Sequence, residues 1–138
     1  MKKIAVIILN WNGADLLRKF LPSVCAHTNA HIADVIVVDN GSDDNSVEVL
    51  KQEFSQVKTL LFPQNCGFAA GYNKALEMLD YKYAVLLNSD VETTPHWLEP
   101  LLEFAEDNPD VAACQPKIKS LTVSYTHLRA HETRHDLV

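Results

Sequence analysis

Residues 4–13, Ile-Ala-Val-Ile-Ile-Leu-Asn-Trp-Asn-Gly, place a polar turn directly after an unbroken apolar run. Such a run is typical of a strand that is covered on both faces, as in a parallel sheet. The Asn-Trp-Asn-Gly that follows contains the residues that most often form turns. The segment therefore predicts a buried strand that carries polar side chains at its C-terminal end.

The same alternation of apolar runs and polar turns recurs along the chain, with helical spacing between the runs. We expect strands at residues 3–9, 35–38, 57–62, 83–87 and 111–118. We expect helices at residues 16–24, 47–54 and 67–79, and one that begins at Pro95 after a capping Thr93 or Thr94. Pro22 should kink or shorten the first helix. Alternating strands and helices predict an α/β fold, Rossmann-like, with a mainly parallel sheet and helices on both faces.

Composition excludes several classes of protein. The 138 residues are 47% hydrophobic and 22% charged, which is ordinary for one soluble domain. No apolar run approaches the roughly 20 residues of a membrane-spanning helix. The net charge of -6 argues against a nucleic-acid partner. Cys25, Cys66 and Cys114 form no CxxC pair, which favours a reducing, cytoplasmic setting. His27, His31 and His96 follow no pattern that suggests a role.

The character of the sequence changes near residue 123. Residues 123–133, Val-Ser-Tyr-Thr-His-Leu-Arg-Ala-His-Glu-Thr, resemble one translated reading frame of a transposase-type sequencing adapter. His127, His131 and His135 would share one face of a helix and could mimic a zinc site, but an accident of adapter translation is the favoured interpretation. We therefore expect a domain over residues 1–122, a non-native tail over 123–138, and a gene that continues beyond residue 122.

Polar clusters follow each of the first four predicted strands. In an open α/β sheet, ligands bind outside the C-terminal ends of the strands. Each cluster alone could be turn chemistry. Four clusters at one edge of the sheet favour a binding site. They are Asn10 with Asn12, residues 39–44, Asn65 with Gly67, and residues 88–92.

Five segments together resemble family 2 glycosyltransferases, which have a GT-A fold, and in particular their rhamnosyltransferase-like branch. The segments are VIILNWN at 6–12, VVDNGSDD at 37–44, NCGFAAGYN at 65–73, LLNSDVE at 86–92 and TPHWLE at 94–99. The resemblance implies inverting, metal-dependent transfer of a sugar from a nucleoside diphosphate to an acceptor hydroxyl. The acceptor would be a saccharide or a lipid-linked sugar of cell-envelope polysaccharide synthesis. The implied location is the cytoplasm, including the inner face of the membrane.

The resemblance also assigns roles to the polar residues. Asn10, Asn12 and Asp39 fall in the nucleotide-sugar site, with Asp39 accepting hydrogen bonds from the base or the ribose. The alternative for Asp39 is an N-cap of the following helix. The set Asn65, Gly67, Gly71 and Asn73 matches the segment that lines the nucleotide pocket; its alternative is a glycine-rich helix entry.

Residues 88–90, Asn-Ser-Asp, occupy the place of the family's DxD motif. Asp90 is the implied ligand of Mg²⁺ or Mn²⁺, which offsets the charge of the leaving diphosphate. Asn88 and Ser89 complete the donor site, with Asn88 suited to a ribose hydroxyl. Tyr72 stands where the family often has Arg, and could stack or donate its hydroxyl. Trp11 is as well explained by base contact as by packing.

The sequence leaves one alternative to a transferase open and argues against two others. The implied general base lies in the acceptor half, beyond these residues, so the chain could be a non-catalytic nucleotide-binding fragment. A receiver-type signalling domain needs an acidic pair after the first strand and Asp after the third, where this chain has Asn10 and residues 63–65, Pro-Gln-Asn. A Rossmann dehydrogenase needs GxGxxG after the first strand, which is absent.

Overall fold

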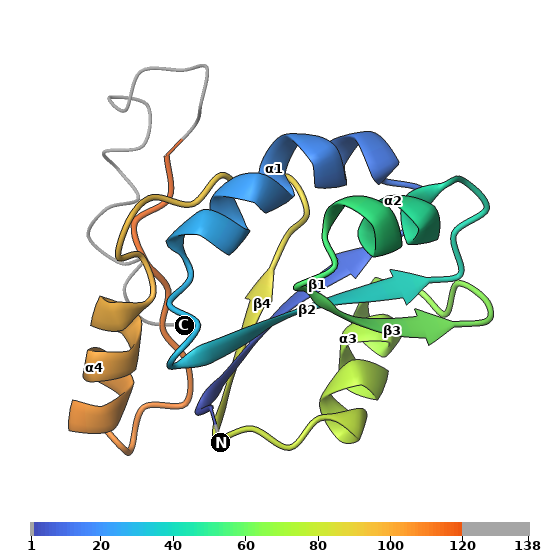
Figure 1. Cartoon of the computed structure of the whole chain (residues 1–138). Helices are drawn as coiled ribbons and strands as arrows, with labels where there is room; N and C mark the ends of the chain where they lie inside the picture. Colours follow the sequence, from blue (N-terminus) through green and yellow to red (C-terminus); the bar gives the residue numbers. More distant parts are fainter. Residues whose placement is uncertain (1, 120–138) are drawn as a thin grey trace. The chain divides into compact units, whose positions relative to one another are not determined.

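The structure is a computed structural model that describes residues 2–119. It divides into two compact units, Met1–Pro95 and His96–Val138. The first unit contains a four-stranded sheet in the order β3-β2-β1-β4, together with helices α1, α2 and α3 (Figure 1). Its elements are β1 (Ile4–Asn10), α1 (Ala14–His27), β2 (Ala33–Asn40), α2 (Ser46–Glu53), β3 (Lys58–Phe62), α3 (Phe68–Met78) and β4 (Tyr83–Leu87). The second unit contains α4 (Glu99–Asp107).

All four strands run in parallel, so their C-terminal ends meet at one edge of the sheet. Ile4 of β1 lies beside Ala33 of β2 and Tyr83 of β4. At the other end Asn10 lies beside Asp39. This register brings the polar residues that follow the strands to a common edge, as the sequence predicts.

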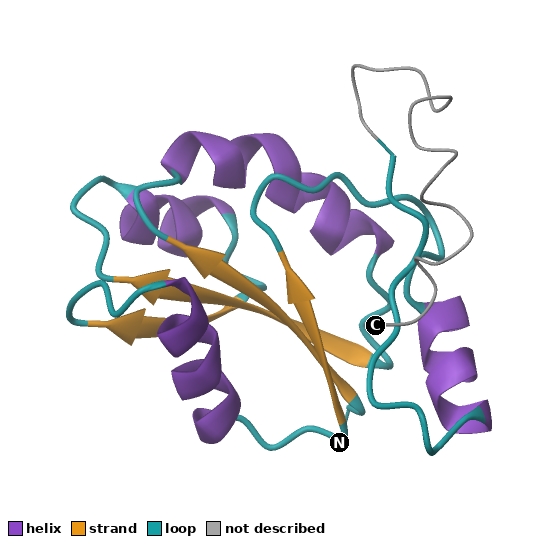
Figure 2. Cartoon of the chain, turned by 180° about the vertical axis from the view of Figure 1, so that it is seen from behind, coloured by secondary structure: helices purple, strands orange, loops and turns teal. Residues whose placement is uncertain are grey.

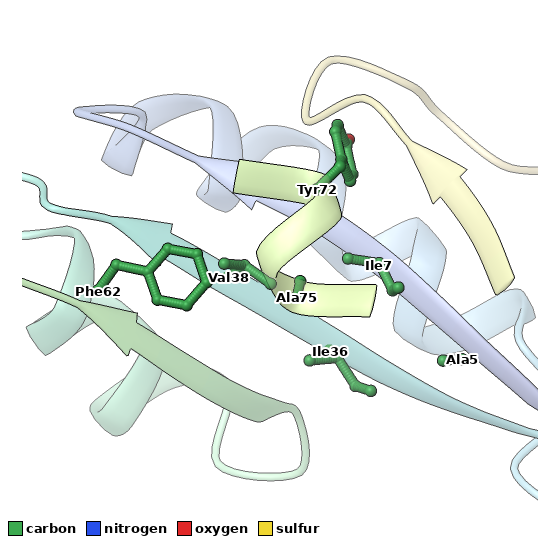
Figure 3. Packing of buried hydrophobic residues seen from close by; sticks show 7 residues of the cluster. All are labelled: Ala5, Ile7, Ile36, Val38, Phe62, Tyr72 and Ala75. Carbon is green, nitrogen blue, oxygen red and sulfur yellow. The ribbon is translucent and has the colours of Figure 1, made fainter. Parts of the chain in front are cut away.

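Helices cover both faces of the sheet, with α1 and α2 on one face and α3 on the other (Figures 1 and 2). The α3 face holds a hydrophobic cluster in which alternate strand residues pack beneath Tyr72 and Ala75 (Figure 3). Its strand members are Ala5, Ile7, Ile36, Val38 and Phe62. The predicted α/β fold with a parallel sheet is confirmed.

Pro22 does not shorten helix α1, which continues five residues past it to His27, because buried Leu21 and Val24 keep packing on either side of the lost N–H. Two expectations for α4 are wrong. Helix α4 begins at Glu99 and not at Pro95, because His96 adopts a left-handed φ of 60° that no helix continues through. Neither predicted threonine caps α4, whose N-cap residue is Leu98.

The strand predicted at residues 111–118 is also absent from the described residues, which have only an isolated bridge at Cys114. Pro116 lacks the N–H that a strand interior requires. The boundary expected at residue 122 and the His127, His131 and His135 stripe lie outside the described residues. Within residues 2–119 no helix is long and apolar enough to cross a membrane.

Candidate functional site

A pocket of about 430 Å³ opens at the C-terminal edge of the sheet in the first unit. Its polar lining residues are Asn40, Asn65, Asn88, Ser89 and Asp90. Its apolar lining residues are Leu9, Trp11, Leu16, Phe68 and Tyr72. Four of the predicted site residues therefore line one pocket: Asn65, Asn88, Ser89 and Asp90.

Asp39 does not line this pocket; its carboxylate joins the ends of β1 and β2. The residue is only 3% exposed. Its Oδ1 accepts hydrogen bonds from Asn10 Nδ2 at 3.0 Å and from Ser42 Oγ at 2.6 Å, and its Oδ2 accepts one from the Ser42 backbone N–H at 3.0 Å. Asp39 is not the N-cap residue of α2, which is Asn45. The carboxylate thus fixes the turn after β2 against β1.

Asn12 extends the same network to the turn at residues 42–44. Its Oδ1 accepts hydrogen bonds from the backbone N–H groups of Asp43 at 2.7 Å and Asp44 at 3.2 Å. Its own backbone N–H donates to Ser42 Oγ at 2.9 Å. Asn12 and Asn10 therefore hold the first two loops together, and neither lines the pocket.

Asp44 connects that turn to the start of two helices. Its carboxylate accepts hydrogen bonds from the backbone N–H groups of Ala14 at 3.2 Å and Ser46 at 2.9 Å, and from the Ser46 hydroxyl. Burial raises the pKa of Asp44, but these hydrogen bonds outweigh burial and bring the pKa below its ordinary value. Asp44 therefore favours its charged form, and that form holds the N-terminal ends of α1 and α2.

Asn40, which the sequence analysis did not single out, holds the loop between β3 and α3. The residue is 2% exposed. Its Oδ1 accepts from the Cys66 backbone N–H at 3.1 Å and from Cys66 Sγ at 3.3 Å. Its Nδ2 donates to Asn65 Oδ1 and to the Gly67 carbonyl, both at 3.2 Å. The amide uses its full hydrogen-bonding capacity. Strand alternation could have found this residue, because Asn40 falls on the α3 face and Asp39 on the opposite face.

The predicted glycines serve backbone geometry. Gly67 precedes α3 with a φ of 90°, a conformation that favours glycine. A Cβ on Gly71 would lie 3.0 Å from both methyl carbons of Leu9 and 3.2 Å from Asn40 Nδ2, so its missing side chain lets α3 pack closely on the sheet. Asn73 is exposed and does not line the pocket. Gly67 and Gly71 thus have backbone roles in the entry and the packing of α3, and the assignment of all three positions to the nucleotide site stays a prediction.

Aromatic side chains form much of the pocket wall. Trp11 is 52% exposed and Phe68 is 67% exposed, which leaves their ring surfaces available to a ligand. Tyr72 is buried, and its hydroxyl donates to the Leu87 carbonyl at 3.1 Å, so that hydroxyl is committed to β4. Burial raises the pKa of Tyr72. Phe68 meets the Tyr72 ring edge-on, with centroids 5.0 Å apart. Sequence reasoning missed Phe68, although its place at the start of α3, directly after the predicted site residue Gly67, could have indicated it.

The residues after β4 supply the donor atoms that a metal would need. Asp90 is exposed, and it is the one carboxylate among the pocket residues. Within residues 2–119 no group of three His, Cys, Asp or Glu side chains could hold a metal ion by itself. A carboxylate, a hydroxyl and an amide oxygen are hard donors that suit Mg²⁺ or Mn²⁺, provided that a phosphate ligand and water complete the coordination. The residues thus fit a metal that arrives with a diphosphate.

Over residues 5–136 the sequence matches the family described as Glycosyl transferase family 2. It is 34% identical over 116 residues to YibD, an uncharacterized glycosyltransferase of Escherichia coli K12, a match that covers 81% of this chain and 33% of the relative. It is 25% identical over 129 residues to a chondroitin synthase of Escherichia coli, covering 91% of this chain and 19% of that protein.

Two solved structures share the fold. S. aureus TarS 1–349 in complex with UDP-GlcNAc matches with a TM-score of 0.68 at 20% identity, over 78% of this chain and 32% of that chain. A mannosyltransferase from Pyrobaculum calidifontis in complex with GDP-Man and Mn²⁺ matches with a TM-score of 0.69 at 20% identity, over 83% and 36% of the two chains. These likenesses establish the GT-A type of fold. The present chain spans at most about a third of the two curated relatives described above.

Proposed function

The chain belongs to glycosyl transferase family 2, and we propose that its pocket binds the nucleoside diphosphate of a sugar donor for transfer to an acceptor hydroxyl. One observation carries this proposal. Exposed aromatic rings and the oxygen donors of residues 88–90 line the same pocket at the C-terminal edge of the sheet. A nucleotide needs both kinds of surface, because its base is flat and apolar on its faces and its diphosphate is doubly charged.

The base binds at the aromatic wall. Trp11 and Phe68 expose ring surface, and stacking on an aromatic ring is worth about 1–3 kcal/mol per base in nucleic-acid complexes. Asn65 lines the same pocket, and its Oδ1 is already used by Asn40 Nδ2 and by the Gly67 N–H at 2.7 Å. Its NH₂ group therefore presents donors to a base or a ribose, which matches the place assigned to Asn65 from the sequence.

The diphosphate binds at residues 88–90, where Asp90 would hold the divalent cation and Asn88 and Ser89 would contact the ribose or the diphosphate. A bound cation would neutralise the charge that develops on the leaving diphosphate. Pocket residues include no Lys or Arg that could do so instead. The Mn²⁺ in the mannosyltransferase complex supports this assignment.

Asp39, Asn10 and Asn12 act indirectly in this proposal. Their hydrogen bonds fix the loops after β1 and β2, and Trp11 lies between the two asparagines. Asp39 thus supports nucleotide binding by holding the aromatic wall. Direct contact between Asp39 and the base or ribose would require the carboxylate to exchange at least one of its present donors.

Transfer itself follows the family reaction, which is an inverting displacement at the anomeric carbon. A general base must activate the acceptor hydroxyl. Asp90 would be occupied by the metal, and no second carboxylate lines the pocket. The base therefore comes from outside the pocket residues. The acceptor is a saccharide or lipid-linked sugar of the cell envelope, and the setting is cytoplasmic, in keeping with free thiols at Cys25, Cys66 and Cys114.

A second candidate is donor binding without transfer by this chain alone. Two observations favour it: the pocket holds a single carboxylate, and the chain spans 33% of the YibD relative. An assay of sugar transfer to a saccharide acceptor separates the two candidates. Transfer by the 138-residue chain supports an active enzyme, whereas donor binding without transfer supports the fragment.

Calorimetric titration with UDP, dTDP and GDP tests the proposed site. We expect tighter binding of one of these nucleotides with Mn²⁺ or Mg²⁺ than with EDTA, and Asp90→Asn should remove most of that difference. Glu92→Gln is the matched control, because it changes a nearby exposed carboxylate that does not line the pocket. Equal affinities with and without metal in the unsubstituted protein would contradict the metal role.

A further inference from the structure

We propose that Ser23 and His27 of α1 are positioning residues that hold the loop after β4 and thereby set the place of Asp90. This inference rests on the proposed function, because it assumes that Asp90 binds the metal. Neither side chain lines the pocket, and no pattern in the sequence pairs them with this loop.

Both backbone polar groups of Thr93 are bound by these two side chains. The Thr93 N–H donates to Ser23 Oγ at 3.1 Å, and the Thr93 carbonyl lies 2.9 Å from His27 Nδ1. A carbonyl oxygen only accepts, so Nδ1 of His27 carries the proton in this contact. Ser23 Oγ in turn donates to the Phe20 carbonyl at 3.0 Å, which fixes the hydroxyl as an acceptor for Thr93.

The spacing of the two side chains makes this a tether. Ser23 and His27 are four residues apart on α1, so they lie one above the other on the same helix face. Thr93 is buried against them. Its own hydroxyl has no hydrogen-bond partner in the described part of the chain. The loop is therefore attached through its backbone, and the threonine side chain is dispensable for the attachment.

Asp90 depends on such an attachment because its side chain is not held directly. Its carboxylate makes no hydrogen bond or ion pair with any described residue. The backbone before it is fixed by β4, whose Leu87 lies beside Ile8. The backbone after it is fixed at Thr93, three residues on. Two anchored ends limit where the carboxylate can lie, which is the preorganisation that a single protein ligand for a metal requires.

Helix α1 also connects the tether to the other loops of the site. Its first N–H, at Ala14, donates to Asp44, and its last turn binds Thr93. Helix α1 thus spans from the network of the β2 loop to the loop that carries Asp90. Substitution of His27 should move Asp90 without touching a ligand.

The test measures UDP affinity by calorimetry, once with Mn²⁺ and once with EDTA. If the protein prefers another nucleoside diphosphate, that nucleotide is the probe. We expect His27→Leu and Ser23→Ala each to lower the affinity with Mn²⁺ by about 3- to 10-fold, the worth of one hydrogen bond. Affinity with EDTA should change less than twofold. His27→Asn should restore the Mn²⁺ effect, because its Nδ2 can donate from nearly the position of Nδ1.

Two controls separate positioning from general damage. His31→Leu removes an exposed histidine whose side chain has no part in the tether, and Thr93→Val removes only the unpartnered hydroxyl. Both should retain the full Mn²⁺ effect. Thermal melting monitors folding, and Ser23→Ala, the smaller change, serves if His27→Leu does not fold.

The outcomes distinguish this inference from the function on which it rests. A Mn²⁺ effect that is absent from the unsubstituted protein refutes the proposed function. A Mn²⁺ effect that is present there and unchanged in both Ser23→Ala and His27→Leu overturns the positioning role alone. Equal losses with Mn²⁺ and with EDTA, or no rescue by His27→Asn, also overturn it, since they indicate a purely structural contact.

Discussion

At the N-terminal edge of the sheet Asp34 binds two lysines and a tyrosine, whereas at the C-terminal edge Asp39 binds only neutral donors. Asp34 binds Lys2 Nζ at 2.9 Å, Lys58 Nζ at 3.0 Å and the Tyr81 hydroxyl at 2.6 Å. Burial raises the pKa of Asp34, but the hydrogen bonds from Tyr81, Lys2 and Lys58 and the charge of Lys58 outweigh it and bring the pKa well below its ordinary range.

The carboxylate at the N-terminal edge stabilises the fold, whereas the C-terminal edge is the one proposed to bind a ligand. At the N-terminal edge Asp34 is paired with two lysines, and these ion pairs join the chain before β1 to the starts of β2 and β3. At the C-terminal edge an amide, hydroxyls and backbone N–H groups satisfy the carboxylates of Asp39 and Asp44 without neutralising them. That edge keeps its negative charge, which a divalent cation can offset locally when a phosphate ligand arrives.

The largest expected effect is that of Asp39→Ala. Removing the carboxylate leaves the Ser42 N–H without an acceptor and leaves buried Asn10 Nδ2 with only its longer contact to Ser42 Oγ, at 3.4 Å. This should lower the free energy of unfolding by about 3 kcal/mol. Urea denaturation measures this loss. Nucleotide binding should weaken by about 1.5–3 kcal/mol as the loops loosen. Unchanged stability with weaker binding would instead assign Asp39 to direct contact with the nucleotide.

Asn40→Asp tests whether the C-terminal edge needs a neutral group at this point. The substitution keeps the shape of the side chain but replaces the donating Nδ2 with a carboxylate oxygen. That oxygen would face the acceptor oxygens of Asn65 and Gly67. We expect a loss of about 2 kcal/mol in unfolding free energy at neutral pH. The loss should shrink on acidification, because repulsion raises the folded-state pKa of the new carboxyl. Asn40→Ala, measured beside it, gives the pH-independent cost of losing the amide.

Asp34→Asn tests the opposite edge. We expect a loss of about 1.5 kcal/mol at pH 7, because hydrogen bonds to charged groups exceed neutral ones in strength. The folded pKa of Asp34 is lowered, so its contribution is present above the unfolded value of about 3.9 and is lost as pH falls below it. The stability difference between the native protein and Asp34→Asn should therefore narrow below about pH 4. A difference that is constant from pH 7 to pH 3 would contradict the ion-pair assignment.

Sequence reasoning predicted the sheet and its functional edge because both depend on local patterns. Apolar runs such as residues 4–9 and 83–87 identify strands, and polar residues after them identify the edge. Hydrogen-bond saturation is not visible in a pattern. Alternation along β2 puts Asp39 and Asn40 on opposite faces of the sheet, but only the structure shows which partners each side chain binds.

Contacts with distant backbone groups left no signal either. His27 binds a carbonyl 66 residues away, and any residue type can supply a carbonyl, so no spacing indicates the pair. Gly71 illustrates a related limit. A glycine that approaches a ligand and one that lets a helix approach a sheet look alike in sequence. They are distinguished here only by the structure, in which a Cβ on Gly71 would lie 3.0 Å from the methyl carbons of Leu9.

The smallest expected change in stability is that of Asp90→Asn. The Asp90 carboxylate has no partner among the described residues, so its charge should contribute little to folding. The free energy of unfolding should change by no more than about 0.5 kcal/mol, the usual range for surface substitutions away from special features. In the presence of Mn²⁺ and UDP, however, the native protein should gain thermal stability that Asp90→Asn does not, because ligands stabilise only the state that binds them. Melting curves with and without the two ligands measure both effects. A large cost in the ligand-free protein would show that Asp90 is held within the fold as Asp34 is, and the contrast between the two edges would then not hold at this residue.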